Sequence, residues 1–209
     1  MLPSEVLKPG MVGVNLKGQF DVLGTINTFA QGDTKAAHVW WVLPNGKIAT
    51  TGAKALLFYG EVDPDEYLKG KTCYLLETVD PLTKWQLGIM QACHQDLMKA
   101  GAGRFYGIWK PFYIGMLGLF FGGVEKMGFK PTSKRPTFPI CSQAVAYPFW
   151  KADVPIGKAQ GKQDWSAVLP ETILKEAQET GFDLSRGWLD NRSTPCYKLR
   201  ILKDAPYQF

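Results

Sequence analysis

Two scarcities in this 209-residue sequence restrict the kinds of site it can hold: it has four cysteines and two histidines. The cysteines are far apart, with neither the CxxC spacing of zinc and redox sites nor the density of a secreted disulfide scaffold. They are Cys73, Cys93, Cys141 and Cys196. We therefore expect reduced thiols, no metal and no cofactor. Any histidine-dependent site must use His38 or His94.

Charge of one sign is not concentrated in the chain. The 24 lysines and arginines exceed the 19 acidic residues by five and form no long basic block, which argues against nucleic acid as a partner. The first ten residues lack a basic region followed by an apolar stretch, so no secretory signal is expected. The sequence therefore predicts a cytoplasmic protein as synthesised, with release through a phage or secretion apparatus as the alternative.

Long hydrophobic runs are also missing. The most apolar stretch, residues 111–124, falls short of the roughly 20 residues that a membrane-spanning helix needs. We interpret it as a buried helix or an interfacial flap, for which contact with a membrane surface is a further hypothesis. There is no internal repeat and no glycine-rich phosphate loop. The oligomeric state does not follow from the sequence.

A hydrophobic fraction of 45% in 209 residues predicts one domain, residues 1–209, with its own core. Strands predominate early and helices in the middle, which indicates an α+β fold with a small antiparallel sheet packed against helices. The expected helices are 20–29, 63–68, 81–100, 140–150 and 169–180. The expected strands are 11–15, 39–43, 47–51, 55–59, 72–79, 182–184 and 196–202. Residues 101–139, rich in glycine and aromatic residues, are expected to be a helical insertion or flap.

The two histidines occupy different settings. His94 directly follows Cys93 in the expected helix 81–100, and neighbouring residues in a helix point about 100° apart, so these two cannot form a dyad. We interpret His94 as a helix-surface residue. His38 begins an apolar strand, where an imidazole can project from the sheet edge into a cleft. A capping or core role for His38 is the alternative that its local sequence leaves open.

Cys141 stands two residues after Pro139, at the expected start of a helix. The unpaired N–H groups and positive dipole end of a first helical turn favour a thiolate. An apolar cysteine is more often a core residue than a nucleophile, so both interpretations stay open locally. Cys73, within a strand, and Cys196, after a proline, have no such setting and are interpreted as structural thiols.

The order of these segments resembles the circularly permuted NlpC-type papain-like hydrolases, a group that includes the YiiX-like proteins. The resemblance is carried by His38-Val39-Trp40-Trp41-Val42-Leu43 with Asn45-Gly46-Lys47-Ile48, and far downstream by Cys141-Ser142-Gln143-Ala144-Val145. Lys8-Pro9-Gly10-Met11-Val12 is similar to the family's opening strand, and Leu169-Pro170-Glu171-Thr172 to the segment after its cysteine helix. The match covers most of the chain, and its strength lies in the shared order of short motifs.

The resemblance implies that Cys141 is a nucleophile and that His38 is the base which takes its proton. The backbone N–H of Cys141 would hold the carbonyl oxyanion, helped by the Tyr106 hydroxyl, with Ser142 beside it. The family's third residue is a carboxylate on the second hairpin strand, a place taken here by Thr50 or, as substitute, Thr51.

The sequence departs from the family pattern at three places. The first is a threonine in place of the family's carboxylate. A threonine hydroxyl can accept from an imidazole N–H but supplies no charge to stabilise imidazolium. Met11 replaces the aspartate of the opening Gly-Asp, and Gln143 replaces a glutamate. These changes leave the predicted fold as it is, but they weaken the expectation that the protein turns over a substrate.

Three functions follow from these expectations. The first is a cysteine hydrolase that opens amide bonds in a peptide or cell-wall peptide, through an acyl-thioester intermediate. The second is a papain-like scaffold with little or no catalysis that serves as a structural or binding protein. The third is a thioesterase or acyltransferase on lipid-like substrates, suggested by residues 111–124 and the tryptophans.

Overall fold

The computed structural model describes residues 2–16, 35–51, 59–99, 140–158, 161, 164–187 and 193–209. Its helices are α1 (Pro3–Val6), α3 (Pro64–Tyr67), α4 (Lys84–Leu97), α6 (Cys141–Lys151), η4 (Trp165–Ala167) and α7 (Pro170–Ser185). Its strands are β1 (Val12–Leu16), β2 (Ala36–Val42), β3 (Ile48–Thr51), β4 (Tyr59–Val62), β5 (Thr72–Thr78), β6 (Leu199–Ile201) and β7 (Tyr207–Gln208). The expected α+β class with a small antiparallel sheet is confirmed.

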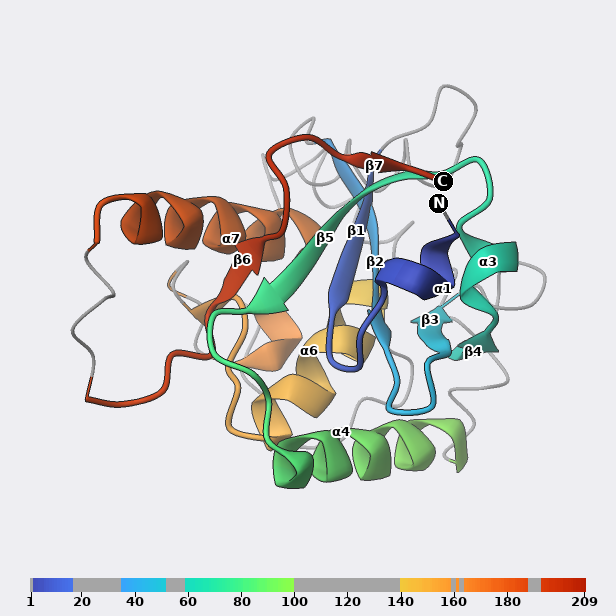
Figure 1. The fold of residues 1–209 in the computed structure, drawn as a ribbon. Helices are drawn as coiled ribbons and strands as arrows, with labels where there is room; N and C mark the ends of the chain where they lie inside the picture. Colours follow the sequence, from blue (N-terminus) through green and yellow to red (C-terminus); the bar gives the residue numbers. More distant parts are fainter. Residues whose placement is uncertain are drawn as a thin grey trace, which may run out of the picture.

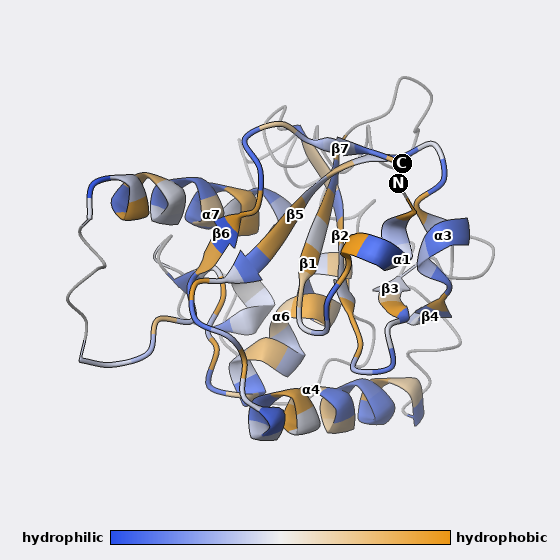
Figure 2. Ribbon diagram, viewed as in Figure 1, coloured by the Kyte–Doolittle hydropathy of each residue, from blue (hydrophilic) through white to orange (hydrophobic). Residues whose placement is uncertain are grey.

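The described strands form one antiparallel sheet in the order β4-β3-β2-β1-β5-β6, with β7 also paired to β5 (Figure 1). Two apolar cores lie on its two faces. The first core joins the sheet to α4, α6 and α7, and the second lies beneath α1 and α3. Figure 2 shows the most hydrophobic residues along the central strands and α6. Within the described residues, no helix is long and apolar enough to cross a membrane.

Alternation along β2 divides its two tryptophans between these cores. Trp41 packs in the first core and Trp40 in the second, and both are fully buried. The Trp40 ring lies against Gly13 of β1, where an added Cβ would come within 2.0 Å of a ring carbon. Glycine is therefore required at position 13. This close approach lets Trp40 Nε1 donate to Asn15 Oδ1 at 2.8 Å.

Several expected elements differ at their ends. The helix expected at 81–100 begins at Lys84, because the Thr83 hydroxyl caps it by accepting from the Gln86 N–H at 3.2 Å. The strand expected at 182–184 is wrong, since α7 continues through Gly181 to Ser185. Of the strand expected at 55–59, the described part is Tyr59, the first residue of β4. The helix expected at 20–29 and the insertion 101–139 lie outside the described residues.

Candidate functional site

His38 lies where β2 is least covered. It is the one residue of β2 that is not fully buried. Its cross-strand neighbour on β1 is Asn15, and strand alternation puts it on the same face as Trp40. The imidazole therefore lies on the second-core face of the sheet, at the margin of that core.

Thr50, and not Thr51, is the threonine that contacts His38 as expected for the third residue of the site. His38 Nε2 lies 2.8 Å from Thr50 Oγ1, so the hairpin of β2 and β3 brings the two side chains into hydrogen-bond contact. Thr51, its neighbour along β3, is buried, and its hydroxyl has no hydrogen-bond partner in the described part of the chain. Adjacent residues of a strand point to opposite faces, which explains why one threonine reaches His38.

Tyr67, at the end of α3, extends this contact to a third side chain. Its hydroxyl lies 3.3 Å from Thr50 Oγ1. Burial of this hydroxyl raises the pKa of Tyr67, the Thr50 and Asn15 side chains oppose that rise, and negative charge on Cys141 adds to it. Sequence reasoning missed Tyr67, because nothing in a four-residue surface helix marks it.

Cys141 is the first residue of α6, as expected, and it is 3% exposed. Gln143 holds the start of this helix: its side chain accepts from the Ile140 N–H at 3.4 Å and donates to the Ser166 carbonyl at 2.9 Å. A glutamate could not make the second bond, which accounts for the amide at this position. Ser142 is fully buried, and its hydroxyl has no hydrogen-bond partner among the described residues.

Together, His38, Thr50 and Tyr67 are in contact, and Cys141 acts on Tyr67 electrostatically. Cys141 belongs to the first core, on the α6 side of the sheet, whereas His38 shares the other face with Trp40. Tyr106, the remaining expected site residue, lies outside the described residues.

Two other cysteines lie in settings that disfavour reaction. Burial raises the pKa of Cys73 to about 12, against a smaller opposing effect of Lys71. Burial also raises the pKa of Cys93, and Asp96 adds to that rise. Thiolates are the reactive form, so both thiols are poor nucleophiles near neutral pH.

His94 is not a surface residue, and that interpretation was wrong. It is 1% exposed, between Tyr59 and Glu61 of β4. Nδ1 lies 2.7 Å from the Tyr59 hydroxyl and Nε2 lies 3.0 Å from a Glu61 carboxylate oxygen. Its ring also meets Trp41 edge to face. The cluster joins α4 to the sheet edge. The sequence signal that could have predicted this cluster is the pair Tyr59 and Glu61, which are two residues apart on one strand.

Burial lowers the pKa of His94, and this effect exceeds the opposing effect of Glu61. The imidazole is therefore neutral near pH 7. A carboxylate can only accept, so Nε2–H donates to Glu61 and Nδ1 accepts from the Tyr59 hydroxyl. With both nitrogens used and the ring enclosed, His94 is a structural histidine.

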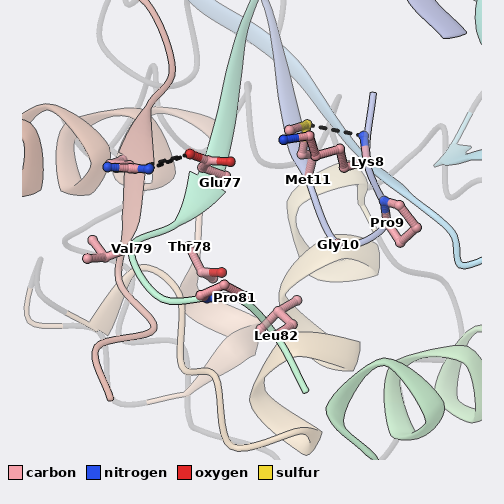
Figure 3. Close-up of a pocket in the computed structure, with 10 residues that line it drawn as sticks. Lys8, Pro9, Gly10, Met11, Glu77, Thr78, Val79, Pro81 and Leu82 are labelled. Carbon is pink, nitrogen blue, oxygen red and sulfur yellow. Dashed lines mark hydrogen bonds and ion pairs between the residues drawn. The ribbon is translucent and has the colours of Figure 1, made fainter. Parts of the chain in front are cut away.

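A cavity of about 230 Å³ opens between residues 8–11, which precede β1, the end of β5 and strand β6 (Figure 3). Its charged wall is the Glu77–Arg200 pair, with 2.7 Å between the closest atoms. It includes neither histidine, none of the four cysteines and none of the expected site residues. No group of three histidine, cysteine or acidic side chains in the described residues is arranged to hold a metal.

The chain was compared with models of protein families, with curated protein sequences and with solved structures, and none of the three comparisons found a match.

Proposed function

We propose that this chain is a cysteine hydrolase of the circularly permuted papain-like type, with Cys141 as nucleophile and His38 as general base. The observation that carries the proposal is the hydrogen-bonded group of His38, Thr50 and Tyr67, together with the position of Cys141 as the first residue of α6. A strand histidine oriented by a second side chain and a cysteine at a helix N-terminus are the parts of an activated thiol.

The reaction begins when His38 takes the proton of the Cys141 thiol. Nε2 contacts Thr50, so Nδ1 is the nitrogen that accepts this proton. The sulfur attacks the substrate carbonyl, and the backbone N–H of Cys141 donates to the oxyanion. His38 returns the proton to the leaving amine as the amide bond breaks. Water, deprotonated by His38, then hydrolyses the acyl-thioester and releases the acid.

The substrate class we propose is an amide bond in a peptide or cell-wall peptide, on the basis of the family resemblance. A thioester intermediate serves amide and ester substrates alike. Acyl transfer to or from a lipid-like substrate would therefore use the same two side chains.

A scaffold with little or no turnover is the second candidate, and two observations favour it. Cys141 is 3% exposed. His38 contacts the Thr50 hydroxyl, which in turn contacts the Tyr67 hydroxyl. Both groups are uncharged and cannot stabilise imidazolium as a carboxylate does. Both candidates predict the same fold, so an experiment on the thiol must separate them.

Acylation by an activated ester separates these candidates. We expect incubation with a p-nitrophenyl ester of a short acyl peptide to give a burst of nitrophenol and one acyl group on Cys141, identified by mass spectrometry and removed by hydroxylamine. Cys141→Ala should abolish the adduct, and His38→Ala should slow its formation about 100-fold, as expected for loss of a general base.

Cys196→Ala is the matched control, because Cys196 is more exposed than Cys141 and lies outside the proposed site. It should leave the burst unchanged. An adduct that persists in Cys141→Ala, or a rate that is independent of His38, would refute the hydrolase and favour the scaffold.

A further inference from the structure

The His38 contact leaves one question that decides which ring nitrogen acts as base: Thr50 can either donate to Nε2 or accept from it. Thr50 Oγ1 has three neighbours, which are His38 Nε2 at 2.8 Å, the Thr51 carbonyl oxygen at 3.2 Å and the Tyr67 hydroxyl at 3.3 Å. The hydroxyl has one hydrogen to donate and two lone pairs to accept with.

A carbonyl oxygen can only accept, so the Thr50 hydrogen must point to Thr51 if that contact is a hydrogen bond. Thr50 then accepts from both of its other neighbours. This arrangement places a hydrogen of His38 on Nε2. It is the only assignment of hydrogens that makes all three contacts hydrogen bonds.

The far end of the group has a fixed direction as well. An indole N–H can only donate, so Trp40 Nε1 gives its hydrogen to Asn15 Oδ1 at 2.8 Å. This fixes the orientation of the Asn15 amide, and the Asn15 side chain lowers the pKa of Tyr67. Since Thr50 gives its own hydrogen to Thr51, the Tyr67 hydroxyl is the donor in its contact with Thr50. The Tyr67 and Trp40 rings also pack edge to face, with centroids 6.3 Å apart.

We propose that Tyr67, whose ring packs against Trp40, is a positioning residue that keeps neutral His38 in the tautomer with its hydrogen on Nε2. The hydrogen bonds from Tyr67 to Thr50 and from Thr50 to the Thr51 carbonyl run in one direction. This network orients the imidazole as a carboxylate would, without supplying negative charge. The catalytic meaning of the proposal rests on the proposed function, whereas the tautomer is a property of the free protein.

The test is ¹⁵N NMR of the full chain labelled in its histidine rings, at about pH 8, where an ordinary imidazole is neutral. Two histidines give two pairs of ring signals, and a His38→Gln spectrum assigns them. We expect His38 to have a protonated Nε2 and an unprotonated Nδ1, with well-separated shifts. His94 should show the same tautomer, since its Nε2 donates to Glu61. A His38 hydrogen on Nδ1, or two averaged signals, would overturn the proposal.

Tyr67→Phe tests the role of the tyrosine. It removes the hydrogen that Thr50 accepts, so the ratio of Nε2–H to Nδ1–H tautomer at His38 should fall about fivefold, the equivalent of one hydrogen bond. Tyr74→Phe makes the same chemical change against the first core and should leave His38 unaltered. Unchanged His94 signals report an intact fold in either variant. A His38 tautomer that is unaffected by Tyr67→Phe would refute the positioning role.

The outcome is distinguishable from that of the acylation experiment. A fixed Nε2–H tautomer in a protein that does not acylate supports the network and refutes the hydrolase. Acylation at Cys141 with a mixed His38 tautomer supports the hydrolase and refutes the network. If Tyr67→Phe does not fold, the tautomer of the unaltered protein still decides whether the proposed direction of the network is right.

Discussion

The two histidines of this chain are surrounded in opposite ways. His94 has a carboxylate partner, Glu61, and is 1% exposed. His38 is only partly buried and contacts the uncharged Thr50 hydroxyl, which in turn contacts the Tyr67 hydroxyl. A histidine next to a carboxylate would ordinarily attract attention as catalytic. Here both nitrogens of that histidine are engaged in joining α4 to β4, so the exposure of the ring distinguishes the two sites better than charge does.

The largest difference between the two sites should be in stability. His94→Ala removes a buried ring and leaves the Tyr59 hydroxyl and the Glu61 carboxylate without their partner, which should lower the free energy of unfolding by about 3 kcal/mol. His38→Ala removes a partly exposed ring and the bond to Thr50, at a cost of about 1 kcal/mol. Urea denaturation of both variants measures the difference. Equal losses, or a larger loss for His38→Ala, would contradict the structural assignment of His94.

A smaller difference should appear in the pH dependence of stability. Burial lowers the pKa of His94 in the folded chain, while the unfolded chain keeps the ordinary value near 6.5. The unfolded state therefore binds more protons as the pH falls below about 6.5, and stability is lost down to the folded pKa. The slope from this one group cannot exceed about 1.4 kcal/mol per pH unit.

The measurement is urea denaturation at about pH 7.5 and about pH 5.5, on either side of the unfolded pKa. We expect His94→Gln to lose less stability between these two pH values than the unaltered chain, because it has no group to protonate there. His38→Gln is the matched control and should retain the loss that comes from His94. A pH dependence that His94→Gln leaves unchanged would exclude His94 as its source.

Local patterns were enough to predict much of the fold. The hairpin of β2 and β3 was predicted from an apolar run and turn residues, and the helix that begins at Cys141 from an apolar run after a proline. The strand β5 was predicted as well. The end of α7 was missed because Gly181 is a common stop signal. The helix continues past this glycine to Ser185, and the Arg186 guanidinium lies over the Phe182 ring, 4.3 Å from its centroid.

The side-chain clusters were harder to predict than the elements that carry them. The pairing of His38 with Thr50 or Thr51 was an expectation from the family resemblance, which puts the third residue on the second strand of the hairpin. Tyr67 and the surroundings of His94 depend on contacts between elements that are distant in sequence, such as the 33 residues between Glu61 and His94. No local pattern in the sequence contains that information, and the burial of His94 was not predicted for the same reason.

The central claim is that His38 activates Cys141, and the rate of alkylation at each cysteine tests it most directly. With iodoacetamide near neutral pH and detection by peptide mass spectrometry, we predict that Cys141 reacts faster than Cys196, although Cys141 is the more buried of the two. His38→Gln should slow Cys141 about tenfold, because an unassisted thiol is only a few per cent thiolate at pH 7, and should leave Cys196 unchanged. A Cys141 that reacts more slowly than Cys196, or at a rate independent of His38, would contradict the account.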